Sequence, residues 1–81
     1  IQFIHCSMIA TDFMETDLSG ALFDSCNLRR AVFSNTNLEK ADFYTSYEYR
    51  IDPEKNKMKK AIFSAQGLHG LLEKYALVIK P

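Results

Sequence analysis

A large apolar residue recurs at every fifth position from residue 3 to residue 43, and this period limits the possible folds more than any other feature. The residue two positions earlier is usually smaller, as at Cys6, Thr16 and Ala21. A five-residue period suits neither regular element, because such residues would step by about 140° around a helix and would alternate between the two faces of a strand. The repeated residues, which we predict to form the core, are Phe3, Met8, Phe13, Leu18, Phe23, Leu28, Phe33, Leu38 and Phe43.

A coil made of five-residue sides reconciles this period with a single core. Each side is then a short extended piece with its first and third residues inward, followed by a bend that restores the inward phase. Four such sides make a turn of about 20 residues, so residues that far apart should stack like neighbouring strands, about 4.8 Å from one another. This register places Phe3, Phe23 and Phe43 in one column. Phe63 continues the column and joins the predicted core.

The rest of the chain predicts a loop and a cap. Residues 46–60 break the repeat and predict an irregular loop, in which Ile51 and Met58 are the expected inward anchors. The predicted domains are a repeat coil over residues 1–65, which includes this loop, and a C-terminal capping helix and tail over residues 66–81. A repeat coil needs such a cap because its end faces are otherwise exposed. The apolar residues of the cap recur at helical intervals and are Leu68, Leu71, Leu72 and Tyr75.

The first turn of the coil carries apolar residues at positions that should point outward. These are Ile4, Ile9 and Met14, whereas polar residues hold the matching places one turn later. An apolar outer surface predicts a cover, either residues upstream of Ile1 or a partner chain.

The charges cancel in total and differ by segment. Ten basic and ten acidic side chains give a formal net charge of zero, so the sum predicts no direct nucleic-acid partner and no membrane partner. Residues 1–45 hold six acids and three bases, whereas residues 46–65 hold five bases and three acids. A solvated wall of mixed charge is the simplest interpretation of this pattern.

No motif predicts catalysis, a metal site or a cofactor. His5 and His69 have no cysteine or acid at ligand spacing, and neither a phosphate-binding glycine loop nor a nucleophile motif is present in the sequence. Cys6 and Cys26 stack in the expected register, and we predict reduced, buried thiols because the chain suggests a cytoplasmic protein. We therefore predict a single domain of 81 residues that is not an enzyme.

The repeated segments resemble the A-(D/N)-L-x-x motif of pentapeptide-repeat proteins. Ala21-Leu22-Phe23-Asp24-Ser25 and Ala41-Asp42-Phe43-Tyr44-Thr45 carry the resemblance, which covers residues 1–45 and one last unit at 61–65. It departs from the motif at Leu22, which is apolar at an outward position. The resemblance implies an all-β solenoid, a right-handed quadrilateral β-helix, here with a short C-terminal α-helical cap.

The function predicted on this basis is a non-catalytic, bacterial protein-interaction scaffold whose partner the sequence does not name. The alternative comes from residues 71–79, which resemble the C-terminal end of quinolone-resistance, Qnr-type, members of the family. That resemblance implies a homodimer through the cap, and binding to DNA gyrase or topoisomerase IV by mimicry of DNA, which would confer quinolone resistance. The candidate partner contacts lie at the tip of the predicted loop and are Glu54, Lys55, Asn56 and Lys57.

Overall fold

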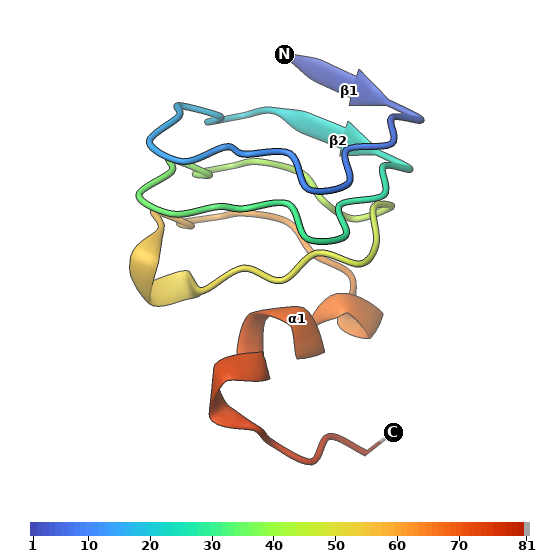
Figure 1. The fold of residues 1–81 in the computed structure, drawn as a ribbon, viewed down its shortest axis with the longest axis vertical. Coiled ribbons are helices and arrows are strands. Elements are labelled where there is room, and N and C mark those ends of the chain that lie inside the picture. The colour runs from blue at the N-terminus through green and yellow to red at the C-terminus, as the bar shows by residue number, and fades with distance from the viewer. Residues whose placement is uncertain (81) are drawn as a thin grey trace.

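The backbone winds around one axis, and each turn lies over the next. The computed structural model describes residues 1–80, and Figure 1 shows the turns stacked between the N-terminus and the C-terminal helix α1 (His69–Leu72). The regular strands are short: β1 (Gln2–Ile4) pairs in parallel with β2 (Leu22–Asp24). Elsewhere single parallel bridges join residues 20 positions apart, for example Ser7 with Asn27. The backbone therefore makes one turn in the 20 residues that the sequence predicts.

The corners of the coil explain how a five-residue repeat keeps one set of side chains inward. In the first two turns the last residue of each repeat adopts a left-handed conformation, with φ between 52° and 61° at the non-glycine corners and 70° at Gly20. A left-handed residue reverses the alternation of a strand and so restores the inward phase. These non-glycine corner residues in the first two turns are His5, Ala10, Glu15, Ser25, Arg30, Asn35 and Lys40. Each costs about 1–2 kcal/mol for an L-residue, which the stacking of the turns must offset.

The core is a set of stacked aromatic rings, as the register predicts. The ring centroids of Phe23 lie 4.9 Å from Phe3 and 4.6 Å from Phe43, and Phe63 follows Phe43 at 5.1 Å. Rings of the adjacent column meet these edge-on, with Phe33 6.4 Å from Phe23. The predicted core residues of the interior are buried: Phe13, Leu18, Phe23, Leu28, Phe33, Leu38 and Phe43. The remaining ones, at the two ends of the stack, are half-buried: Phe3, Met8 and Phe63.

Small polar side chains at the start of some sides satisfy backbone groups of the turn before. The Thr36 hydroxyl donates to the Phe13 carbonyl at 2.6 Å, and the buried Ser46 hydroxyl donates to the Phe23 carbonyl. Buried carbonyls without such donors would cost about 1–3 kcal/mol each. The second position of each side has a related use, since the Asn37 side chain accepts from the Glu39 N–H at 3.0 Å. The repeat therefore prefers small polar residues and Asp or Asn at these places for local structural reasons.

The coil register continues at both ends of residues 46–60. Tyr47 bridges to Asn27 and Lys57 bridges to Asn37, each at the 20-residue spacing. Between these bridges the left-handed corner moves to Glu48, with φ 64°, and the next side chain, Tyr49, turns inward. The 3₁₀ turn η1 (Pro53–Lys55) follows. The departure from the five-residue pattern is thus confined to the middle of the expected loop.

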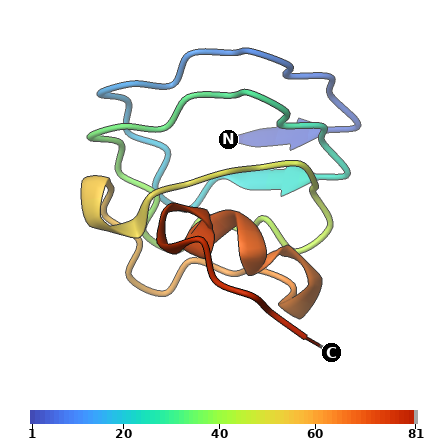
Figure 2. The ribbon, with the colours of Figure 1, turned by 60° about the horizontal axis from the view of Figure 1, so that its bottom comes forward.

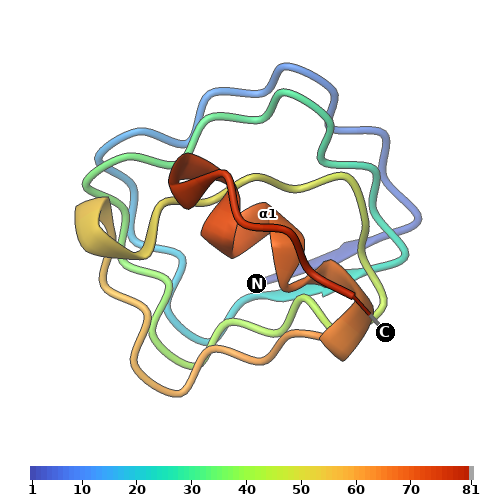
Figure 3. The same cartoon turned by 90° about the horizontal axis from the view of Figure 1, so that it is seen from below.

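The C-terminal segment lies across the last turn of the coil. It contains the 3₁₀ turn η2 (Ala65–Gly67), α1 and the 3₁₀ turn η3 (Glu73–Tyr75), and Figures 2 and 3 show it across the open end of the coil. Leu71 packs against the core and Leu72 is half-buried, whereas Leu68 and Tyr75 are exposed. Residues 76–80 form no strand, and Pro81, the last residue of the predicted cap and tail, lies outside the described residues.

Candidate partner-binding surface

The predicted contact turn is built by a capped 3₁₀ turn on the third turn of the coil. The Asp52 carboxylate accepts from the Glu54 N–H at 2.9 Å, and Pro53 occupies the first position of η1. An Asp cap followed by Pro is a strong local signal for a turn start, because the ring presets φ and the carboxylate pairs a free N–H. The sequence therefore defines this turn locally.

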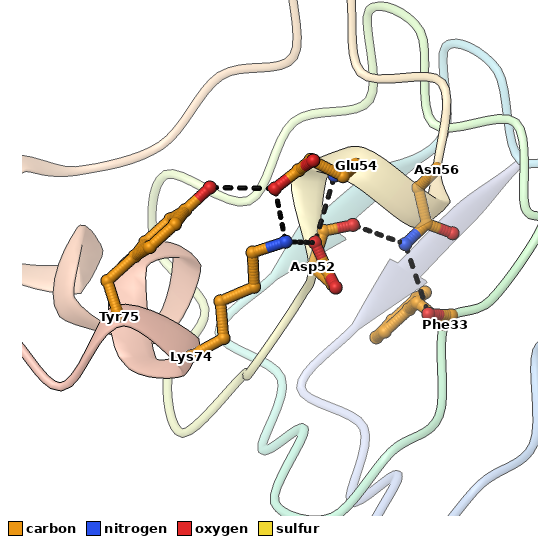
Figure 4. Close-up of polar contacts among 6 residues, drawn as sticks. All are labelled: Phe33, Asp52, Glu54, Asn56, Lys74 and Tyr75. Carbon is orange, nitrogen blue, oxygen red and sulfur yellow. Dashed lines mark hydrogen bonds and ion pairs between the residues drawn. The ribbon is translucent and has the colours of Figure 1, made fainter.

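Glu54 is held by the C-terminal cap. Its carboxylate accepts a hydrogen bond from the Tyr75 hydroxyl at 2.7 Å and a second bond from the Lys74 ammonium. Lys74 also pairs with Asp52, with 3.1 Å between Nζ and Oδ1. Figure 4 shows these groups converging between η1 and η3. Glu54 thus joins the coil to its cap, and its carboxylate is already engaged within the chain.

The same contacts shift the ionisation of this cluster. The hydrogen bond from Lys74 lowers the pKa of Glu54, and that bond raises the pKa of Lys74. The backbone N–H of Glu54 lowers the pKa of Asp52, with Lys74 adding to the effect. Donation to Glu54 raises the pKa of Tyr75, because it favours the protonated phenol. All four groups are therefore held in the charge states that form the contact at neutral pH.

Asn56 is likewise used inside the coil. Its side-chain amide donates to the Phe33 carbonyl at 3.0 Å and to the Asp52 carbonyl at 2.9 Å, and its oxygen accepts from the Thr36 N–H at 3.0 Å. These bonds tie the turn to the neighbouring side of the coil, and Figure 4 shows the two that the amide donates. Asn56 therefore has a structural role that the sequence pattern did not indicate.

Lys55 and Lys57 are the members of the predicted contact that project from the coil. Both are exposed and line a shallow groove that runs over three turns of the coil along one corner. The bridges stack Asp17, Asn37 and Lys57 along this groove. Its lining therefore changes from acidic on the first turn to basic on the third.

Tyr49 is the residue that the sequence interpretation missed. Its ring is 4% exposed and packs between Phe43 and Phe63, with centroids 5.8 and 5.4 Å away. Burial raises the pKa of Tyr49, and its hydroxyl has no hydrogen-bond partner among residues 1–80. The available signal was the pair Gly67 and Gly70, since a side chain on either would overlap with Tyr49.

The first turn of the coil keeps its outward apolar side chains in solvent. Ile4, Ile9 and Met14 are 51%, 50% and 48% exposed. No His, Cys, Asp and Glu side chains of residues 1–80 gather in a group of three that could hold a metal ion. Across the same described residues, no helix is both long enough and apolar enough to cross a bilayer.

A coil of stacked five-residue sides with a helical cap defines a repeat protein that presents flat walls of side chains. The family model for pentapeptide repeats matches residues 2–46 with eight copies of the repeat. The chain therefore belongs to the pentapeptide-repeat family. No curated protein sequence matches it.

Two solved structures share the fold. Both are trypsin-treated variants of QnrB1, described as a plasmid-mediated fluoroquinolone resistance protein, and each is 12% identical to this chain with a TM-score of 0.50. The matches cover 99% and 98% of this chain and 45% of each QnrB1 chain. The chain thus spans less than half the length of these structures, and at this identity the likeness is one of fold.

Proposed function

We propose that this chain is a non-catalytic protein-interaction scaffold, built as a right-handed quadrilateral β-helix over residues 1–65 and capped by residues 66–81. The observation that carries the proposal is the complete filling of the interior, where Phe23 and Phe43 are 0% exposed. A solenoid with a packed interior acts through its walls, on which stacked side chains form extended columns. We place the protein in the cytoplasm of a bacterium, as the sequence suggests.

The proposed partner surface is centred on Lys55 and Lys57. These two side chains are free to contact a partner, whereas Glu54 and Asn56, which the sequence places in the same contact, are engaged in bonds within the chain. Because the cap holds η1 from below, the turn presents both lysines from a rigid base. Rigid presentation lowers the entropy cost of binding.

The second candidate is binding to DNA gyrase or topoisomerase IV with protection from quinolones. Its support is membership of the family and the fold shared with a fluoroquinolone resistance protein. Mimicry of DNA needs acidic side chains repeated along the rod, because duplex DNA carries a charge about every 1.7 Å. The column Asp17, Asn37, Lys57 changes sign along the rod, which weakens mimicry on this wall. We therefore rank this function second.

A gyrase supercoiling assay with and without a fluoroquinolone separates the two functions. Protection predicts that the purified protein restores supercoiling in the presence of the drug, and that Lys55→Ala/Lys57→Ala reduces the effect if the proposed contact is used. Arg29→Ala/Arg30→Ala removes the same charge from another exposed side of the coil and serves as the matched control. Unchanged drug sensitivity at every protein concentration would exclude the resistance role and leave the scaffold proposal.

We also propose that the cap mediates a homodimer. Leu68 and Tyr75 are 45% and 52% exposed, and Leu77 and Val78 extend the apolar surface. Light scattering tests this, with a dimer mass expected for the unchanged chain and a monomer mass for Leu68→Asp. Val32→Asp places the same charge on an exposed apolar wall position and should leave the dimer intact. A monomer mass for the unchanged chain at high concentration would rule out the dimer.

A further inference from the structure

Five lysines gather on one wall of the coil and the corners beside it. Lys57 and Lys59 lie on the side that starts at Asn56, and the Lys40 N–H donates to the Lys59 carbonyl at 3.0 Å. Lys40 and Lys60 are left-handed corners with φ 61° and 62°, one turn apart. We call this surface the lysine face, and its members, all exposed, are Lys40, Lys55, Lys57, Lys59 and Lys60.

The lysine face keeps an excess of positive charge, although Glu15 and Asp17 line the same groove as Lys55 and Lys57. The ion pairs formed within residues 1–80 use Arg50 and Lys74 as cations and include no member of this face. Glu39 is the carboxylate that shares a surface recess with Lys40, Lys59 and Lys60. Glu54, beside Lys55, is already bound by the cap. A chain with a net charge of zero therefore carries a wall on which five lysines outnumber the three carboxylates beside them that the cap does not bind, those of Glu15, Asp17 and Glu39.

The composition of the face indicates the chemistry of its ligand. The cations of the face are all lysines. Lysine binds the phosphates of a nucleic-acid backbone as a point charge. Lys57 lies at a bridge position of this side and Lys59 and Lys60 lie in the corner turn that follows, so the three lysines fall within four consecutive residues. Closely spaced lysines of this kind suit a row of phosphates.

We propose that the lysine face binds the phosphodiester backbone of duplex DNA without reading its sequence. This inference does not depend on the proposed function, and it revises the expectation, drawn from the summed charge, that the chain has no direct nucleic-acid partner. Five phosphate contacts predict a slope of about −4.5 for log affinity against log salt, which is about a 500-fold loss between about 50 and 200 mM.

Fluorescence anisotropy with a labelled DNA duplex of mixed sequence tests the proposal across this salt range. We expect Lys57→Gln/Lys59→Gln to lower the slope to about −2.7 and the loss to about 40-fold. Arg29→Gln/Arg30→Gln removes equal charge from another side and should leave the slope unchanged. Because all four side chains are exposed, melting curves of both variants should match the unchanged chain and exclude misfolding.

Three results would overturn the inference. The first is no detectable binding to the duplex at about 50 mM salt. The second is an equal loss of affinity in the lysine and arginine variants, which would assign binding to total charge rather than to the lysine face. The third is binding to phosphatidylserine vesicles with none to DNA, which would assign the face to a membrane surface.

Discussion

Replacing Gly70 by alanine tests the way the cap docks on the coil. A Cβ atom at Gly70 would lie 2.2 Å from the carbonyl oxygen of Tyr49, where ordinary contact begins at 3.4 Å. Because the opposing atom belongs to the backbone, rotation of a side chain cannot relieve the overlap. The cap must instead move by about 1 Å, which also strains the bond from the Ile51 N–H to the Gly70 carbonyl at 3.1 Å.

Gly70→Ala should lower the free energy of unfolding, whereas the same substitution in an ordinary helix raises it. Glycine to alanine in a helix interior stabilises by up to about 1 kcal/mol. Here overpacking costs about 1–3 kcal/mol, and loss of the backbone hydrogen bond adds about 0.5–1.5 kcal/mol. The net loss is about 2 kcal/mol, which corresponds to about 8–16 °C in Tm for a domain of this size. Thermal unfolding followed by circular dichroism measures it.

Tyr49→Phe provides the control for this prediction. It removes a buried hydroxyl that has no partner among residues 1–80, so Tm should stay the same or rise. The change should not rescue Gly70→Ala, whose overlap is with the backbone. It should partly rescue Gly67→Ala, whose Cβ would lie 1.7 Å from the Tyr49 hydroxyl. A Tm for Gly70→Ala at or above that of the unchanged chain would refute the docking geometry.

Three further predictions concern the core, the contact between Glu54 and the cap, and the two thiols. Phe23→Ala, in the middle of the ring stack, should lower the free energy of unfolding in urea by about 3–5 kcal/mol. Phe3→Ala should lower it clearly less, because Phe3 is only half-buried. Equal losses for the two variants would contradict the ring stack as the source of stability. Since its contacts lower the pKa of Glu54, the stability from this carboxylate is complete above its usual pKa and lost as pH falls through the lowered value. Tm of Glu54→Gln should therefore fall less than that of the unchanged chain between about pH 5 and 3, and parallel profiles would argue against the contact. Burial raises the pKa of Cys26, which is 0% exposed, so a thiol reagent should label the half-buried Cys6 first and Cys26 only on unfolding; simultaneous labelling would contradict this order.

The repeat is legible in the sequence because each five-residue side is specified locally. The inward residue, the small residue before it and the Asp or Asn between them act within a few bonds of one another, as in the bond from the Met14 N–H to Asp12. A register that depends only on such local units can be counted forward without knowledge of the structure. Counting in this way placed Phe3 and Phe63 at opposite ends of one ring column.

The candidate surface could be predicted in part. Asp52 and Pro53 mark a turn by their own chemistry, so the position of the turn could be predicted from the sequence. The bonds of Glu54 and Asn56 could not be predicted, because their partners Tyr75 and Phe33 are distant in the chain and close only in space. The moved corner at Glu48 buries Tyr49, which the sequence analysis did not place among the inward anchors of this segment.

The sequence by itself determined the period of the coil, the identity of its core and the position of its projecting turn, since each follows from interactions between near neighbours in the chain. The tertiary structure decided how the cap sits on Tyr49 through Gly70 and which carboxylates are engaged within the chain. It also decided where the lysines gather, because winding the chain brings Lys40 beside Lys59 and Lys60. Composition sums charge over the whole chain, whereas a ligand meets only the charges on one wall.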